Sequence, residues 1–339
     1  MRPWFPRFFL LRLSLVPLLV GYFALMGFMT LSQDQLLYRP DPSPPSPANM
    51  SARRGPALAI WPAGEGAAFR GYVRALPGKV DPDANQFDAP PGPVVGIHDA
   101  TGAIPSASGV NPSAPLNITS PRGTVLVFHG NAGSARDRAY YLPALEPLGV
   151  RVVLAEYPGY GGRPGQPSEA SLVADGRETL RQVRATFGDP VWVWGESMGA
   201  AVAAQVGSDP AGPAAGIFLI TPWDNLPELA QSLYWYLPAR WLVRDAYDSR
   251  AALQGYRGPI GVLIAGQDQI IPPDQGRRLF AALPEPKRQW LFPSADHNSW
   301  PAGAGAGWWR EALDWLTAEA NSGVQPTKGS IAVSAAKDR

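Results

Sequence analysis

The 339-residue chain contains no cysteine, only three histidines and a formal net charge of +1. The absence of cysteine excludes disulfides, zinc–thiolate sites, cysteine-linked lipid anchors and a cysteine nucleophile, and it leaves the redox compartment undetermined. The near-zero charge, with no basic stripe among the aromatic residues, gives no reason to expect nucleic-acid binding. No histidine–carboxylate cluster has the spacing of metal ligands, so we expect no metal and no cofactor. What remains is a chain with 45% hydrophobic residues, enough for one large core.

The most informative stretch is an apolar run of strand length, 191–194, that leads directly into Gly195-Glu196-Ser197-Met198-Gly199 and then into alanine-rich sequence. Gly-x-Ser-x-Gly between a strand and a helix is the pattern of a nucleophile elbow, a tight turn that exposes the serine hydroxyl above the sheet edge. The pattern alone is weak in a chain with 36 glycines, but the strand–turn–helix context strengthens it. We therefore expect Ser197 to be a nucleophile.

A serine nucleophile needs a base, for which imidazole is the usual choice, and a carboxylate that orients this base. The candidate bases are His98, His129 and His297. We prefer His297, because it lies in a loop after a late predicted strand, near the end of the domain. His129 ends an early strand, where we expect it to pack beneath the following loop, and His98 lies in a Pro/Gly-rich segment.

The orienting acid should follow a strand that lies between the nucleophile and the base in the sequence. Asp268 meets this condition, since it comes just after the apolar run 260–265. The order serine, aspartate, histidine is also the chain order of hydrolases that carry a nucleophile elbow. The rival acids are Asp224, Asp274 and Asp296.

Two backbone amides are candidates for binding the developing oxyanion. The N–H of Met198 begins the helix after the nucleophile, and the second would come from the loop after the strand 124–129, with Asn131 preferred and Ala132 second. The rival interpretation of residues 130–134 is a phosphate-cradling turn. The segment lacks the lysine and the full glycine spacing of a P-loop, so we favour the oxyanion loop.

Five segments in order resemble the α/β-hydrolase superfamily over residues 120–317, and within it the membrane-associated ABHD12/13/17-like, BEM46-like branch that is often labelled serine aminopeptidase-like. The segments are His129–Gly133, Glu156–Gly161, Gly195–Gly199, Gly266–Asp268 followed by Ile271-Pro272, and Asp296–Asn298. The resemblance implies an eight-stranded, mostly parallel sheet with helices on both faces. It also implies serine hydrolase activity, with Ser197 as nucleophile, Asp268 as acid and His297 as base. Gln267 departs from relatives that often carry a small or acidic residue there.

Apolar runs alternate with helical patterns through this region, which independently predicts a parallel sheet covered on both faces. The predicted strands are 124–129, 150–155, 191–194, 216–220, 260–265 and 288–292, and the predicted helices are 136–146, 169–187, 198–207, 274–283 and 308–319. Residues 69–75 alternate enough for an antiparallel edge strand.

An apolar run over residues 13–31, preceded by Arg2, Arg7 and Arg12, is long enough to span a bilayer as one transmembrane helix. The arginines predict a cytoplasmic N-terminus and an extracytoplasmic enzyme, on the periplasmic side if the organism is bacterial. A cleaved signal peptide is the alternative, but its apolar core is usually shorter, and no clean Ala-x-Ala site follows.

We therefore divide the chain into a membrane anchor at 1–31, a Pro-rich linker at 32–57, a hydrolase domain at 58–320 and a disordered tail at 321–339. The linker reads as a stiff spacer, although the resemblance suggests that residues 36–38 dock near the domain instead. Residues 77–122 read as a loop insertion, which carries the sequon Asn117-Ile118-Thr119.

Residues 221–257 interrupt the alternation of strands and helices and are rich in aromatic residues. In this architecture the segment overhangs the nucleophile, so it is a candidate cap and acyl-binding wall, with Trp223, Trp235 and Trp241 as substrate contacts. The alternatives are an ordinary packing helix, and a membrane-interface position for Trp235 and Trp241.

Together these observations predict a membrane-anchored serine hydrolase for an ester or thioester with a lipophilic acyl group. A serine peptidase or aminopeptidase acting on small peptides would share every motif. A catalytically silent membrane-tethered scaffold is the third possibility.

Overall fold

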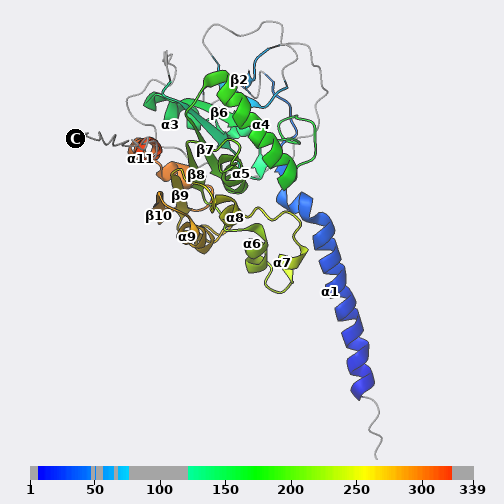
Figure 1. Ribbon diagram of the computed structural model, residues 1–339. Helices are drawn as coiled ribbons and strands as arrows, with labels where there is room; N and C mark the ends of the chain where they lie inside the picture. The colour runs from blue at the N-terminus through cyan, green and yellow to red at the C-terminus, as the bar shows by residue number, and fades with distance from the viewer. Residues whose placement is uncertain (1–6, 47–49, 51–55, 65–67, 76–120, 323–339) are drawn as a thin grey trace, which may run out of the picture.

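The computed structural model describes residues 7–46, 50, 56–64, 68–75 and 121–322 (Figure 1). An eight-stranded sheet forms the centre of the domain, in the order β10-β9-β8-β7-β4-β6-β3-β2. Its pairing is parallel from β10 to β6 and antiparallel from β6 through β3 to β2, which confirms the expected mostly parallel sheet. The strands are β2 (Leu58–Trp61), β3 (Gly71–Arg74), β4 (Thr124–Phe128), β6 (Arg151–Ala155), β7 (Val191–Glu196), β8 (Gly216–Ile220), β9 (Ile260–Ala265) and β10 (Lys287–Phe292).

Helices cover both faces of this sheet, as expected. On one face lie α4 (Glu169–Phe187), α5 (Met198–Gly207), α8 (Ser249–Leu253) and α9 (Pro273–Ala282), and on the other α3 (Tyr141–Leu145) and α11 (Ala306–Ser322). Successive residues of a strand point to opposite faces, so Val193 packs with the first group and Trp194 with the second. Central strands that are buried on both faces are apolar throughout, which is why the sequence pattern identifies them.

Two local expectations need correction. The helix expected over 136–146 is divided into η1 (Ala135–Arg138), α3 and η2 (Glu146–Leu148). Pro143 and Pro147 lie in this stretch, and each lacks the N–H that a continuous helix would need. The strand expected over 69–75 is β3, and it is antiparallel as expected, but β2 lies outside it and forms the sheet edge.

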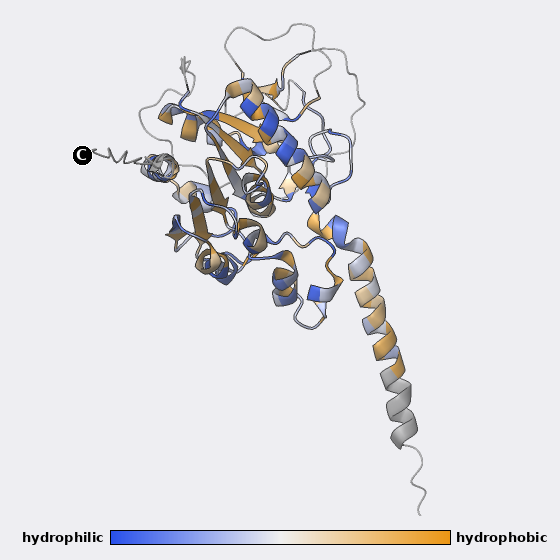
Figure 2. Cartoon of the chain, in the orientation of Figure 1, coloured by the Kyte–Doolittle hydropathy of each residue, from blue (hydrophilic) through white to orange (hydrophobic). Residues whose placement is uncertain are grey.

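The helix α1 (Arg7–Leu37) projects from the domain as a single long rod (Figure 1). Among the described residues it alone is long and apolar enough to cross a membrane, over Val16–Leu37, and its most apolar stretch is not buried in the protein. Hydrophobic residues recur along the part of α1 that Figure 2 colours. A signal sequence has the same features, so the assignment of α1 as an anchor stays a prediction.

The segment that follows, expected as the start of a spacer, lies against the domain. Tyr38 is buried, and its hydroxyl hydrogen-bonds the Asp245 carboxylate and the Tyr247 hydroxyl. Directly after it, β1 (Arg39–Pro40) pairs in parallel with β5 (Ala132–Gly133). The chain therefore docks on the domain at the position that the resemblance suggested.

Several sequence-based expectations lie outside the described residues. They concern Arg2, the linker residues 47–49 and 51–55, residues 76–120 with His98 and the sequon, and the tail beyond 322.

Three short helices occupy the segment between β8 and β9, which the sequence marked as a candidate cap. They are α6 (Leu226–Leu233), α7 (Ala239–Leu242) and α8. In Figure 1, α6 and α7 lie between the sheet and the upper half of α1. After β10, the short helix α10 (Trp300–Gly303) leads into α11.

Candidate active site

Ser197 lies between the end of β7 and the start of α5, with φ 55° and ψ −120°. A positive φ is unusual for a residue other than glycine, and such strain is typical of a nucleophile elbow. Both flanking glycines are required by close packing. A Cβ atom on Gly195 would lie 2.1 Å from the carbonyl oxygen of Gly199, and one on Gly199 would lie 2.3 Å from that of Phe128. The turn is therefore held tightly against the neighbouring strand β4.

His297 and Asp268 meet the serine in one hydrogen-bonded row. Nε2 of His297 lies 3.0 Å from Oγ of Ser197, and Nδ1 lies 2.6 Å from Oδ2 of Asp268. Asp268 follows β9, and its Oδ1 accepts hydrogen bonds from the N–H groups of Ile270 and Ile271, which fix the carboxylate. An ionised carboxylate only accepts hydrogen bonds, so Nδ1 carries the proton and Nε2 is free to take the serine proton.

The rival acids have other partners. The Asp296 carboxylate accepts the N–H groups of Asn298 and Ser299, which lower the pKa of Asp296, whereas the His297 ring hydrogen-bonds Asp268. Asp274 is paired with Arg277 on the surface of α9. Burial raises the pKa of Asp224, which is not among the residues that line the pocket over Ser197.

His129, the other described histidine, lies beneath the loop after β4 and does not contact Ser197 in the structure. It is buried, with Nε2 3.0 Å from Oε1 of Glu156 and Nδ1 2.8 Å from the Gly130 carbonyl oxygen. The other carboxylate oxygen of Glu156 accepts the hydroxyl of Ser134 and the N–H of Ala135. This is the packing position that the sequence suggested for His129.

Of the two amides expected to bind the oxyanion, one follows Ser197 in the chain and the other lies in the loop after β4. Met198 is the first residue of α5, where N–H groups have no partner within the helix. The loop after β4 lies against Ser197, since a Cβ on Gly130 would be 3.5 Å from Cβ of Ser197. Its next residue, Asn131, is held by its side chain, which donates to the Leu37 carbonyl. Among the described residues, no hydrogen bond engages the N–H of Asn131, so this amide is available to a ligand.

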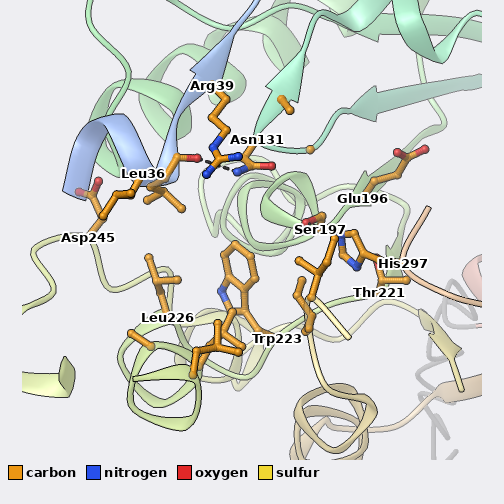
Figure 3. Close-up of a pocket in the computed structure, with 18 of the residues that line it drawn as sticks. Leu36, Arg39, Asn131, Glu196, Ser197, Thr221, Trp223, Leu226, Asp245 and His297 are labelled. Atoms are coloured by element: carbon orange, nitrogen blue, oxygen red, sulfur yellow. Dashed lines mark hydrogen bonds between the residues drawn. The ribbon is translucent and has the colours of Figure 1, made fainter. Parts of the chain in front are cut away.

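A pocket of about 710 Å³ opens over Ser197 and is mostly apolar. Figure 3 shows Ser197 and His297 at one end, Leu36, Arg39 and Asp245 at the other, and Trp223 between them. Of the three tryptophans expected to contact substrate, Trp223 is 4% exposed and lines the pocket. Trp235 and Trp241 are 77% and 80% exposed and are not among the lining residues.

The structure adds lining residues that the sequence analysis did not identify. Five of them come from α1: Met29, Gln33, Asp34, Leu36 and Leu37. In the sequence, the only indication of these contacts was the family resemblance, which suggested that residues 36–38 dock near the domain.

Polar residues close to the serine form a separate cluster that also lines the pocket. Glu196 is buried and accepts hydrogen bonds from Nε of Arg138, at 2.8 Å, and from the hydroxyl of Tyr140. Burial, followed by the charge of Glu196, raises the pKa of Tyr140 well above its usual range, so the phenol stays protonated and acts as a donor. The carboxylate beside Ser197 is therefore compensated by an arginine. Within the described residues, no group of three or more His, Asp or Glu side chains could hold a metal ion.

Comparison with known proteins gives the following similarities. A family described as serine aminopeptidase, S33, matches residues 119–252. Uncharacterized protein Rv2307c of Mycobacterium tuberculosis is 36% identical over 220 residues, which cover 59% of this chain and 78% of that protein. Lysophosphatidylserine lipase ABHD12 of Mus musculus is 29% identical over 182 residues, which cover 48% of this chain and 46% of the lipase.

Among solved structures, a monoacylglycerol lipase of Paleococcus ferrophilus has a TM-score of 0.46 and 20% identity, covering 59% of this chain and 96% of its own. Est1E of Butyrivibrio proteoclasticus, solved with ferulic acid, has a TM-score of 0.49 and 14% identity, and the match covers 58% of this chain and 90% of Est1E.

Proposed function

We propose that this chain, which belongs to the α/β-hydrolase superfamily and within it to the ABHD-like branch, is a membrane-anchored serine hydrolase that cleaves an ester or thioester with a lipophilic acyl group. The family is one of hydrolases. The observation that carries the finer proposal is the hydrogen-bonded row of Ser197, His297 and Asp268, with distances of 3.0 and 2.6 Å, at the end of a largely apolar pocket.

In the proposed reaction, Oγ of Ser197 attacks the acyl carbonyl while Nε2 of His297 takes its proton. Asp268 holds the imidazole in the required tautomer and stabilises the imidazolium that forms. The N–H groups of Met198 and Asn131 bind the oxyanion, a contribution that is typically worth about 100- to 1000-fold in kcat per donor. The leaving group takes the proton from His297. A water molecule, activated by the same base, then attacks the acyl-enzyme and releases the acid.

The apolar side chains of the pocket support an acyl substrate. The wall includes Leu226 and Leu229 of α6, together with Trp223, and α1 contributes Leu36 and Leu37. A hydrocarbon chain placed there would lose contact with water along most of its length, at about 0.8 kcal/mol per buried CH₂ group. The similarity to a lysophosphatidylserine lipase agrees with this substrate class.

The alternative is a peptidase, which the description of the matching family favours. An aminopeptidase needs an acid that binds the substrate ammonium group. Three described acids line the pocket. Glu196 is paired with Arg138, Asp34 lies 3.3 Å from Arg244, and Asp245, at the far end from Ser197, accepts a hydrogen bond from the Tyr38 hydroxyl. The acid next to Ser197 is therefore already compensated by an arginine, which favours the esterase proposal over the peptidase.

The test compares p-nitrophenyl esters of increasing chain length with aminoacyl anilides. We expect ester hydrolysis that increases with chain length, because the wall is apolar, and no measurable anilide cleavage. Preferential cleavage of the anilides would refute the esterase proposal. A fluorophosphonate probe completes the test, since it should label the wild type and not Ser197→Ala. Equal labelling of both proteins would favour the scaffold hypothesis.

For the location of the enzyme, we propose that α1 stays in the membrane and that the domain is extracytoplasmic. The absence of cysteine makes this easy to measure, because Ala318→Cys on α11 creates a single exposed thiol. A membrane-impermeant maleimide added to intact cells should label this thiol. Labelling only after lysis would contradict the proposed side of the membrane, and release of labelled protein into the soluble fraction would favour a cleaved signal peptide.

A further inference from the structure

The end of α6, the turn that follows it and α7 together carry an unusual number of exposed apolar side chains. We call residues 233–242, from Leu233 to Leu242, the tip. Leu233, Trp235, Tyr236 and Trp241 are 43%, 77%, 49% and 80% exposed. Soluble monomers rarely expose large apolar residues so close together, and such patches mark contact surfaces. Leu237, in contrast, is buried, so the tip has a small core of its own that supports the outward-facing side chains.

The tip lies along one side of α1. Met26 and Met29 pack against the cluster formed by Ala230, Leu237 and Ala239. The two ends of this contact are marked by hydrogen bonds. The Tyr22 hydroxyl donates to the Tyr236 carbonyl at 3.3 Å, and the Gln33 amide donates to the Leu242 carbonyl at 3.2 Å. In Figure 1, α7 accordingly lies beside the upper half of α1.

The contacts set the depth of the tip relative to the anchor. A helix rises 1.5 Å per residue, so along α1 Tyr22 lies about 17 Å from Gln33, on the side away from the domain. A bilayer core requires roughly 20 apolar residues, and the uncharged part of α1 between Arg12 and Asp34 is about that long. When α1 spans a bilayer, its polar boundary on the domain side therefore lies near Gln33 and Asp34. The tip, which contacts α1 from Tyr22 to Gln33, therefore extends past that boundary into the lipid.

The composition of the tip fits this environment. Trp241 is adjacent to Leu242, whose carbonyl contacts Gln33 at the boundary. Tryptophan prefers this interface between headgroups and acyl chains, where its ring is in an apolar environment and its N–H stays hydrated. The tip has one charged residue, Arg240, whose long stem can carry its guanidinium toward the headgroups. Arg244, just beyond the tip, pairs with Asp34 at the expected boundary.

We propose that the tip inserts into the bilayer beside α1, and that the pocket over Ser197 opens to lipid between these two elements. The partner is a phospholipid bilayer. The pocket wall supports this, because Met29 and Leu36 of α1 face it together with Leu233 and Leu237 of the tip. An acyl chain then moves from the bilayer to the serine without crossing water. This inference rests on the proposed role of α1 as a membrane span.

The first experiment measures depth with single cysteines in the full chain, which has none of its own. Trp235→Cys and Trp241→Cys are labelled with an NBD fluorophore in phosphatidylcholine vesicles, and quenching by doxyl-labelled phosphatidylcholine is recorded. Phe28→Cys, on the exposed side of α1, reports on the anchor, and Ala318→Cys, on α11, reports on the water-exposed domain. We expect quenching by lipid at positions 28, 235 and 241, and not at 318.

The outcomes separate two failures. Lipid quenching at position 28, with aqueous iodide quenching at 235 and 241, would overturn tip insertion and leave the anchor intact. Iodide quenching at all four positions would overturn the anchor itself and tip insertion with it. Hydrolysis of a soluble p-nitrophenyl ester by the same samples reports independently on the proposed serine hydrolase.

The second experiment uses the double variant Trp235→Ser/Trp241→Ser. Membrane affinity scales with the apolar area that is inserted, so we expect hydrolysis of a long-chain ester embedded in phosphatidylcholine vesicles to fall about tenfold. Hydrolysis of soluble p-nitrophenyl acetate should be unchanged, which also shows that the variant is folded. Equal activity of variant and wild type on the embedded ester would overturn the proposal.

Discussion

The described part of the domain contains two histidine–carboxylate pairs, each with a serine, and their difference explains why one can be catalytic and the other structural. In the pair of His297 and Asp268, the serine contacts the histidine. In the pair of His129 and Glu156, Ser134 contacts the carboxylate instead. The same three functional groups are therefore connected in a different order.

That order determines whether the serine can be activated. His129 has one ring nitrogen on Glu156 and the other on the Gly130 carbonyl, so neither can take a proton from a serine. Access differs as well. The side chains of His129 and Glu156 are 1% and 0% exposed, whereas His297 is 10% exposed and lines the pocket. We interpret the buried pair of His129 and Glu156 as structural: its hydrogen bonds stabilise the loop that carries Asn131.

The largest expected effect is the difference in activity between the alanine variants of the two serines. Ser197→Ala should lower kcat for a soluble ester by about 10⁴- to 10⁶-fold, because the covalent step is lost. Ser134→Ala should keep activity close to that of the wild type. Steady-state kinetics of both variants test the comparison directly, and a comparable loss in the two would show that our division into catalytic and structural pairs is wrong.

The next effect concerns the orienting acid. Asp268→Asn should lower kcat about 10⁴-fold with little change in the melting temperature, since the amide stabilises the wrong histidine tautomer. Asp296→Asn is the matched control beside the same histidine. It should leave kcat nearly unchanged, because Asp296 bonds backbone N–H groups rather than the imidazole. A larger loss of kcat in Asp296→Asn than in Asp268→Asn would show that Asp296, and not Asp268, orients the histidine.

A smaller effect is expected at the buried pair. Glu156→Gln removes the charge that holds His129, Ser134 and Ala135, and should lower the free energy of unfolding by about 1–3 kcal/mol. Urea denaturation measures this. Glu311→Gln, which affects an exposed pair with Arg288, is the control and should cost less than about 1 kcal/mol. Similar losses in both variants would mean that the buried pair adds no special stability.

The smallest effect is a pH dependence at the turn that carries His297. Backbone N–H groups lower the pKa of Asp296 in the folded protein, so this carboxylate contributes stability above its unfolded pKa, near about 3.9. The contribution is lost as the pH falls through the lower folded pKa. Unfolding midpoints between pH 5 and pH 2 should therefore fall less steeply in Asp296→Asn than in the wild type. Parallel curves would show that the turn does not depend on this charge.

Local patterns in the sequence were sufficient for much of the fold and for the composition of the candidate site. Strands buried on both faces must be apolar throughout, so the parallel part of the sheet could be predicted. The tight turn at Ser197 leaves a local signature, because Gly195 and Gly199 have no room for a side chain. The two partners of Ser197 could be chosen by their positions after strands, which a parallel sheet brings to one edge.

The tertiary structure decided what no local pattern encodes. Trp223, Trp235 and Trp241 occur in one aromatic segment and look equivalent in the sequence, yet only Trp223 faces the pocket. The stretch 13–31 was read from its length as an anchor, while the end of α1 also forms part of the pocket wall. Proline positions divided an expected helix, and the docking of Tyr38 replaced an expected spacer. Hydrophobic periodicity depends on neighbours in the chain, whereas the side on which a residue is buried depends on which distant segment packs against it.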